Sequence, residues 1–463
     1  MLVRFNVKNF LSFSERIDIS SHKELSHEFS MIPGKVRLNS EHVYQNKKQS
    51  LLRMAAIYGA NASGKSNIVK AIDFFREMTL SGKCPLGASE KYSKIEAENK
   101  YKPSYFEAEI LLGDEVYSYG FEVVLSMGLI ESEWLAKLSN EKTSYLFYKN
   151  GKDDEYHFDD VLKNNNVLDV YQQGIKGSNV LFLAEMNNNK QGIYLKYKNI
   201  NILQDIYSWF NDSLEVLFPG YPPAEASYLI NTTKLSKVVD VLKAFGTGIV
   251  AAIEVKEDFN KLLETLPKTI RLDLINNIEK IKQVNEKDPK SKVHWSVLIR
   301  NRNNIFGIEL NSNNNIRAYT LQFEHENIDK DIHFKMSEES DGTARLFELI
   351  EILLSDKNKT YIIDELDRCL HPCLTYKFIE KFFEYTNNKR IQLIVTTHES
   401  RLMDFKLLRR DEIWFVDKER TGNSNIYSLE EYNTRFDQKV DKAYLEGRYG
   451  GVPIFTTLFP LGE

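Results

Sequence analysis

The sequence contains little cysteine, and this scarcity excludes a fold built on disulfides. Its 463 residues include three cysteines, which are Cys84, Cys369 and Cys373. So small and odd a number cannot form the framework of a secreted domain, which favours a reducing, cytoplasmic location. Cys369 and Cys373 are four residues apart, but no further Cys/His cluster lies nearby. They are therefore more consistent with small buried apolar side chains than with metal ligands.

The sequence also lacks long apolar runs and an excess of positive charge. No stretch of about 18 uncharged apolar residues occurs, so no membrane span is expected. The opening, Met1 to Phe5, does not resemble a signal peptide. A net charge of −5 lowers the expectation of nucleic-acid binding, although a local basic face remains open. The 42% hydrophobic and 27% charged content is ordinary for a globular protein with two or three domains.

The most informative feature that is present is a phosphate-binding loop. Gly59-Ala-Asn61-Ala-Ser63-Gly64-Lys65-Ser66-Asn67 contains the pattern G-x-x-x-x-G-K-S. An apolar run precedes it and an amphipathic run follows it, which is the strand, loop and helix context that the pattern needs. The glycines allow close approach of the backbone, Lys65 would reach the β- and γ-phosphates, and Ser66 would hold Mg²⁺. The sequence therefore predicts ATP and magnesium binding.

Two later elements have the character of the other half of an ATP site. Asp364 and Glu365 end the apolar run Tyr361 to Ile363, and His398 ends the next apolar strand. Asp364 would hold the metal, Glu365 would act as the base or position the attacking water, and His398 would contact the γ-phosphate and that water. Neither the acidic pair nor the histidine is specific by itself. Their order along the chain after the phosphate loop makes the ATP-site interpretation stronger.

A third element precedes an amphipathic helix. Ser340-Asp341-Gly342-Thr343 could simply cap that helix. Alternatively, the helix start presents N–H groups and the Ser340 hydroxyl to a phosphate, which would then belong to a neighbouring subunit.

The chain divides into three parts by composition. Residues 1–150 carry half-exposed strands and the phosphate loop, and residues 331–463 carry continuous apolar strands that suit a sheet buried on both faces. Residues 151–330 are rich in Asn and Lys and have helical spacing, which predicts an inserted, largely helical region with short strands at its end. The predicted fold class is α/β.

In this order, the elements resemble an ABC-type ATPase head, with a mixed or parallel sheet, helices and an antiparallel β lobe. The opening Asn9-Phe10-Leu11-Ser12-Phe13 is similar to that of RecF, SMC and OLD-like heads. The sequence most resembles bacterial AAA-type ATPases of antiphage systems, such as abortive-infection and RloA-like proteins and the ATPase subunits of PARIS and Septu. The shared features are Ser340-Asp341-Gly342-Thr343, Asp364-Glu365-Leu366-Asp367 with Leu370-His371-Pro372, and the ending Tyr444-Leu-Glu-Gly-Arg-Tyr-Gly-Gly-Val452-Pro453.

The resemblance covers about residues 1–150 and 330–455, and it implies a role for each matching residue. Lys65 and Ser66 take the Walker A roles, Asp364 and Glu365 the Walker B roles, and His398 the switch-histidine role. Ser340 and Gly342 take the signature role, in which one subunit contacts the nucleotide of another. Asp341 and Thr343 depart from the transporter-like signature, His371 stands where many heads carry an aspartate, and the expected Q-loop glutamine is missing.

The resemblance also implies partners. It predicts a homo-oligomer of heads that controls a separate effector, by analogy a nuclease, with a phage protein or DNA as the trigger. Two alternatives remain, a RecF-like DNA-repair ATPase and a scaffold that binds ATP without turning it over. Glu365 argues against the scaffold, and the weak basic character argues mildly against DNA repair.

Overall fold

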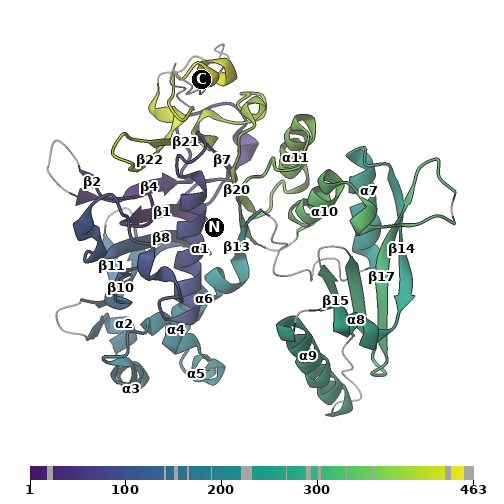
Figure 1. The fold of residues 1–463 in the computed structure, drawn as a ribbon. Coiled ribbons are helices and arrows are strands. Elements are labelled where there is room, and N and C mark those ends of the chain that lie inside the picture. The colour runs from purple at the N-terminus through teal and green to yellow at the C-terminus, as the bar shows by residue number, and fades with distance from the viewer. Residues whose placement is uncertain are drawn as a thin grey trace, which may run out of the picture. The chain divides into compact units, whose positions relative to one another are not determined.

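The structure is a computed structural model that describes residues 1–17, 24–139, 142–150, 155–163, 166–188, 190–219, 232–266, 268–287, 294–300, 304–329, 331–355, 358–432 and 440–452. The chain forms two compact units (Figure 1). Unit 1 consists of Met1–Phe218, Lys357–Leu366 and Asn387–Glu463, and unit 2 of Pro219–Asp356 and Asp367–Thr386.

Unit 1 is built on a six-stranded sheet that carries the predicted nucleotide site. Five of its strands are parallel, and the last is antiparallel to its neighbour. The three strands β19, β20 and β7 are buried along their whole length, because most of their side chains are apolar on both faces. The order is β13 (Leu214–Leu217), β19 (Thr360–Ile363), β20 (Gln392–Thr396), β7 (Met54–Tyr58), β21 (Ile413–Lys418) and β22 (Ser424–Ser428).

A second sheet of unit 1 has seven antiparallel strands. Its side chains alternate between a buried and a partly exposed face, as at Phe106, Glu107 and Ala108. This alternation agrees with the half-exposed strands predicted within residues 1–150. The order is β12 (Tyr156–Phe158), β11 (Thr143–Lys149), β10 (Leu129–Leu138), β9 (Glu115–Val124), β8 (Ser104–Leu112), β1 (Leu2–Lys8) and β4 (His27–Ser30).

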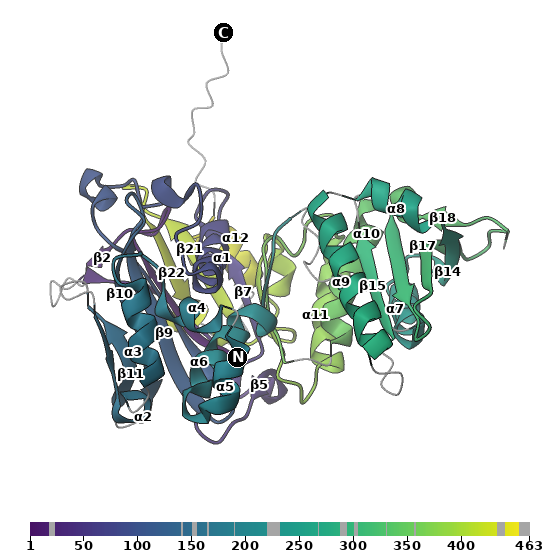
Figure 2. The same cartoon turned by 90° about the horizontal axis from the view of Figure 1, so that it is seen from below.

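Helix α1 (Lys65–Ser81) joins both sheets in one hydrophobic core. Its Ile68 and Phe75 belong to the same buried cluster as Phe121 of β9 and Ile394 of β20. Short helices, of which α4 contacts α1, add apolar side chains to this core (Figures 1 and 2). They are α2 (Asp160–Lys163), α3 (Asn166–Ile175), α4 (Phe182–Asn187), α5 (Gln191–Lys196) and α6 (Asn201–Ser208), and a π-helical turn, Trp209–Ser213, follows.

The compact units divide the chain at other residues than those predicted from the sequence. The predicted insert began at residue 151, whereas unit 1 continues to Phe218. The reason is that the apolar side chains of α2 to α6, such as Leu203 and Ile206, pack into the core around α1. These helices are therefore part of the nucleotide-binding unit and do not belong to the insert.

Unit 2 contains a five-stranded antiparallel sheet with helices. Strands at the end of the predicted insert are present, whereas β14 was not foreseen. Leu262 and Ile278 of two helices pack against Ile308 of the sheet. The elements are α7 (Thr232–Ala244), β14 (Ile249–Glu257), α8 (Phe259–Thr265), α9 (Lys268–Lys287), β15 (Trp295–Arg300), β16 (Ile305–Leu310), β17 (Ile316–His325), β18 (Phe334–Lys335), α10 (Asp341–Leu354) and α11 (Pro372–Tyr385).

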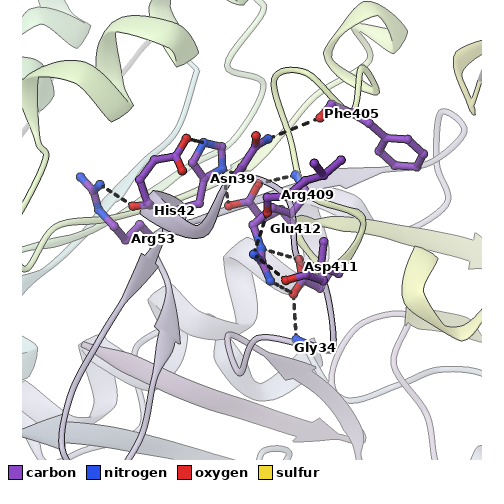
Figure 3. A network of polar contacts seen from close by, with 11 residues as sticks. Gly34, Asn39, His42, Arg53, Phe405, Arg409, Asp411 and Glu412 are labelled. Carbon is purple, nitrogen blue, oxygen red and sulfur yellow. Dashed lines mark hydrogen bonds and ion pairs between the residues drawn. The ribbon is translucent and has the colours of Figure 1, made fainter. Parts of the chain in front are cut away.

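A buried polar network fixes the start of β21 to the segment before β7, at the sheet edge opposite the phosphate loop (Figure 3). Arg409 donates to both oxygens of Asp411, at 2.9 and 2.6 Å, and both side chains are 2% exposed. Arg409 also donates to the carbonyl of Leu38 at 3.0 Å. Nδ1 of His42 lies 3.0 Å from both carboxyl oxygens of Glu412.

The remaining described elements of unit 1 are short. They are β2 (Arg16–Ile17), β3 (Glu24–Leu25), β5 (Val43–Tyr44), β6 (Leu51–Leu52) and α12 (Val440–Leu445). Of the sequence motif that ends the chain, Pro453 lies outside the described residues. Cys369 and Cys373 are exposed, so the expectation that they are buried is wrong.

Candidate nucleotide-binding site

The phosphate loop connects β7 to α1 and depends on two glycines. Gly64 has φ +113° and precedes the first residue of α1. A Cβ there would lie 2.4 Å from the Ser424 hydroxyl, and a Cβ at Gly59 would lie 2.3 Å from the carbonyl oxygen of Val416. Both positions therefore exclude any other residue type without rearrangement. The predicted strand, loop and helix order is confirmed.

Lys65 folds back over this loop. Its Nζ donates to the carbonyl oxygens of Gly59 at 2.7 Å and Ala60 at 3.0 Å, and the side chain is only 6% exposed. Asn61 lies exposed on the loop. Within the described part of the chain, the hydroxyl of Ser63 is buried and has no hydrogen-bond partner. The loop thus gathers an ammonium group and backbone N–H groups where a polyphosphate can bind.

Asp364 meets Ser66 although 298 positions separate them. The Ser66 hydroxyl donates to Asp364 Oδ1 at 3.1 Å, and Thr396 Oγ1 donates to the same oxygen at 2.6 Å. The contact arises because β7, β19 and β20 are parallel neighbours, so their carboxyl ends lie at one edge of the sheet. The structure brings the predicted Walker A and Walker B residues together.

Glu365 follows Asp364 in a left-handed backbone conformation, with φ +53°. Its N–H donates to Thr396 Oγ1 at 2.8 Å, and the next N–H, of Leu366, donates to the carbonyl of Thr396 at 3.0 Å. These two bonds to the end of β20 hold the turn in place. The Glu365 side chain is partly exposed at the same sheet edge.

His398 lies at this edge as well. The N–H of the preceding residue, Thr397, donates to the carbonyl of Ile57 at 3.1 Å, which fixes the chain beside the strand that enters the phosphate loop. The imidazole is exposed. Its role next to the terminal phosphate stays a prediction.

Three polar side chains behind the loop form a layer that sequence reasoning missed. The amide of Asn67, which we expected to face the nucleotide, donates to the Ser12 hydroxyl at 2.8 Å. Ser424 donates to the Ser63 carbonyl at 2.6 Å and lies 2.7 Å from Ser12 Oγ. Ser12 belongs to the opening motif, which could have indicated it, whereas Ser424 has no sequence signal.

Tyr444 also packs close to this loop, with its ring centroid 6.0 Å from that of Tyr58. Its hydroxyl donates to the Gly451 carbonyl at 2.9 Å, and burial raises its pKa to about 12. A Cβ at Gly451 would lie 3.3 Å from the Cα of Gly59. The motif that ends the chain therefore supports the phosphate loop from behind.

Ser340 and Gly342 belong to unit 2. Ser340 Oγ accepts from the N–H of Thr343 at 3.1 Å and so caps α10. A Cβ at Gly342 would lie 2.9 Å from the carbonyl oxygen of Cys369. His371 similarly caps α11, by accepting from the N–H of Cys373 at 3.2 Å. The contact of Ser340 and Gly342 with a second subunit's nucleotide stays a prediction.

The residues present fit a magnesium ion. A serine hydroxyl and a buried carboxylate meet at the loop, and Mg²⁺ is commonly held by one or two protein oxygens together with substrate phosphates. The described residues contain no group of three or more His, Cys, Asp or Glu side chains that could hold a metal by itself. Ser66 and Asp364 would therefore share the ion with a nucleotide.

The fold and this geometry define a P-loop protein of the ATPase class, as the sequence predicted. The family described as "AAA domain, putative AbiEii toxin, Type IV TA system" matches residues 54–181 and 198–404, which is well over half of the chain. The chain belongs to this family.

Known proteins provide more distant comparisons. A Helicobacter pylori protein (strain ATCC 700392 / 26695) named ATP/GTP phosphatase is 23% identical over 283 residues, covering 58% of this chain and 69% of that protein. An SMC head bound to the C-terminal winged-helix domain of ScpA has a TM-score of 0.41 and 16% identity, with 93% and 99% of the two chains covered. The SMC head domain from Thermotoga maritima has a TM-score of 0.33 and 13% identity, with 92% and 98% covered.

Helices long and apolar enough to cross a membrane are not found among the described residues.

Proposed function

We propose that this chain is the ATP-binding and hydrolysing subunit of a bacterial antiphage system of the abortive-infection type. In this proposal, ATP-dependent head-to-head assembly lets the protein sense a trigger and control a separate effector. The observation that carries the ATPase part of the proposal is the meeting of Ser66 and Asp364 at 3.1 Å, with Glu365 next in the chain. The family description, with its putative AbiEii toxin, supports the defence role.

Each residue of the site has a distinct task in hydrolysis. Lys65 and the N–H groups at the start of α1 bind and orient the phosphates. Magnesium, held by Ser66 and Asp364, would supply charge stabilisation to the transferring phosphoryl group. Glu365 positions the attacking water and accepts its proton, and His398 donates a hydrogen bond at the terminal phosphate.

Assembly requires a second copy of the chain in this proposal. Ser340 and the N–H groups at the start of α10 would contact the nucleotide bound by the other copy. Hydrolysis is expected to be slow, because a switch gains from dwelling in its ATP state. The Helicobacter pylori relative, which is named an ATP/GTP phosphatase, supports nucleotide hydrolysis in this chain.

The test compares Glu365→Gln with the wild type. Replacing the carboxylate by an amide should preserve ATP binding and lower phosphate release by about a hundredfold or more, because the proton acceptor is lost. Light scattering after size exclusion should then show a doubled mass, or a higher multiple, with ATP and magnesium only. Glu399→Gln, the same change at the same sheet edge, should hydrolyse ATP like the wild type.

Three results would contradict the proposal. Phosphate release by Glu365→Gln at the wild-type rate would refute the assigned base. A mass that ATP leaves unchanged would refute assembly, and tight binding of duplex DNA ends at physiological salt, without any partner, would favour the RecF-like alternative instead.

A further inference from the structure

An aromatic stripe crosses the outward face of the seven-stranded sheet in unit 1, away from the nucleotide site. Neighbouring strands contribute its rings, and the opposite face of the same strands carries the buried core. We define the stripe as Tyr105 of β8, Trp134 of β10, Tyr145 and Tyr148 of β11, and His157 of β12.

The rings of the stripe form a continuous row. Tyr105 and Trp134 have centroids 5.3 Å apart, Trp134 is the cross-strand partner of Tyr148, and Tyr148 lies 4.8 Å from His157. Strand β9 interrupts the row only with Gly120. A Cβ at Gly120 would lie 2.4 Å from the Trp134 ring, so the glycine lets this ring lie flat across the strand.

The aromatic side chains of the stripe are accessible to solvent, although they are large and apolar. Tyr145 is 53% exposed and Tyr148 is 42% exposed, while Trp134 and Tyr105 are partly exposed. Large aromatic side chains on a solvent face add little to the stability of a fold, because their apolar area stays in contact with water. Clustered exposed aromatics of this kind are typical of interaction surfaces.

A single carboxylate holds the inner rings in fixed positions. Glu107 accepts from Tyr105 OH at 2.8 Å, from Trp134 Nε1 at 3.3 Å, from Ser118 Oγ at 2.6 Å and from Asn6 Nδ2 at 3.1 Å. Rings that are already immobilised lose little conformational entropy when a partner binds. This rigidity is the property of an aromatic anchor in an interface.

The negative charge around the stripe indicates which kind of partner it can bind. In β8 to β10 and their turns, Ser104 to Leu138, the sequence has seven acidic residues, of which Glu133 is buried on the core face, and one basic residue, Lys137, which pairs with Glu115 at 3.3 Å; β11 adds Lys149. Glu122 is the cross-strand partner of Tyr105, and its carboxylate accepts from Ser132 at 2.8 Å. Such a field repels the phosphates of nucleic acid and attracts cationic side chains.

We propose that the aromatic stripe is a docking surface for a protein segment that presents arginine side chains. The planar guanidinium stacks on Trp and Tyr rings and can pair with a carboxylate in a bidentate way, so Trp134 and Glu122 together complement it. Lysine satisfies the charge but stacks less well. The proposal does not rest on the nucleotide site.

The test measures binding of a fluorescein-labelled synthetic peptide in which arginines alternate with Gly-Ser, by anisotropy on the full chain at about 0.15 M salt. The double variant Tyr148→Ser/Glu122→Lys should bind this peptide about tenfold or more weakly, because a stacking ring and a carboxylate are lost. A peptide with lysine in place of arginine should bind the wild type several-fold more weakly.

The matched control changes the same residue types in unit 2. Tyr385 is 40% exposed and Glu384 is 62% exposed, so Tyr385→Ser/Glu384→Lys makes an equal change in charge and aromatic area. This variant should bind the arginine peptide like the wild type. The single variant Tyr145→Ser, at a more exposed ring, gives an independent measurement should the double variant unfold.

Three outcomes would overturn the proposal. The first is equal affinity in the stripe variants and the wild type, and the second is an equal loss in the unit 2 control. The third is binding of an oligothymidine probe that competes with the peptide and is lost in the stripe variants, which would assign the surface to single-stranded nucleic acid. Retained ATP binding and an unchanged thermal transition establish that each variant is folded.

Discussion

Glu365 occupies a backbone conformation that a glutamate rarely adopts. Its φ of +53° places it in the left-handed region, which costs a residue with a Cβ about 1 kcal/mol or more. The hydrogen bonds of Glu365 and Leu366 to Thr396 hold it there. Strained backbone conformations of this kind are often found at residues that take part in a reaction. Here the left-handed conformation directs the chain away from the line of β19 at Glu365.

Replacing Glu365 by glycine and by alanine separates strain from chemistry. Both variants should lose ATP hydrolysis, since neither has a carboxylate. The glycine variant should be more stable to denaturant than the alanine variant by about 1 kcal/mol, because glycine adopts positive φ readily. Urea titrations of the two proteins measure this difference. Equal stabilities would show that the turn is unstrained.

At the level of residues, the sequence predicted that Ser66 and Asp364 belong to one site, but it did not predict the contacts around them. Lys65, Ser66 and Asp364 were identified because their spacing, around glycines or after an apolar strand, is typical of phosphate and magnesium binding. Ser424 could not be identified, because a serine in a hairpin has no distinguishing pattern. The left-handed turn at Glu365 also depends on Thr396, a contact across two strands that the order of residues does not reveal.

Among the elements, α10 tests the part of the proposal that concerns assembly. Ser340→Ala removes the side-chain oxygen that caps this helix and should lower the free energy of unfolding by about 1 kcal/mol. Ser340→Asp keeps a capping oxygen and should restore this stability, while its added negative charge should still weaken assembly with ATP. Mass measurements with ATP and urea titrations of both variants provide the comparison. Full assembly by Ser340→Asp would indicate that the residue is only a cap.

His42, in the network before β21, makes a contribution to the stability of the fold that depends on pH. Burial lowers the pKa of His42 to about 3, and burial raises the pKa of the adjacent Glu412 above its ordinary value. When folded, His42 therefore stays neutral at a pH where the unfolded chain, with a histidine pKa of 6.5, binds a proton. The contribution of neutral His42 to the free energy of unfolding is therefore complete above pH 6.5. It is lost as the pH falls towards 3, because protonation of the unfolded chain then favours unfolding.

Comparison with His42→Gln isolates this effect. The difference in unfolding free energy between wild type and variant should shrink as the pH falls below 6.5, by at most about 1.4 kcal/mol per pH unit. Urea titrations of both proteins at several pH values between 7 and 4 measure it. A difference that stays constant over this range would show that His42 is protonated alike in the folded and unfolded chains.

The sequence predicted the elements of the parallel sheet because their apolar runs are continuous and end in recognisable motifs. It did not predict that α2 to α6 belong to unit 1. Their amphipathic pattern shows that one face is buried, but it does not show which partner buries it. Strand β14 was missed for a related reason, since Ile249–Glu257 alternates only partly and is mostly half-exposed.

For the whole molecule, ATP should act as a stabilising ligand. With magnesium and free ATP at about 100 times its dissociation constant, the folded state should gain about 2.7 kcal/mol. Thermal denaturation should therefore shift upward in the wild type. Lys65→Ala should lose most of this shift, whereas Lys70→Ala, an exposed lysine on the same helix, should keep it. An equal shift in Lys65→Ala would exclude the phosphate loop as the binding site.

The discontinuity of unit 1 has a practical consequence for dissecting the protein. The chain leaves this unit after Phe218 and again after Leu366, one position beyond Glu365. No contiguous fragment that leaves out unit 2 can therefore contain both the phosphate loop and the acidic pair. A minimal version would need two engineered bridges, one in place of Pro219–Asp356 and one in place of Asp367–Thr386. The second bridge would begin beside the acidic pair, so its length and flexibility would directly affect the turnover being measured.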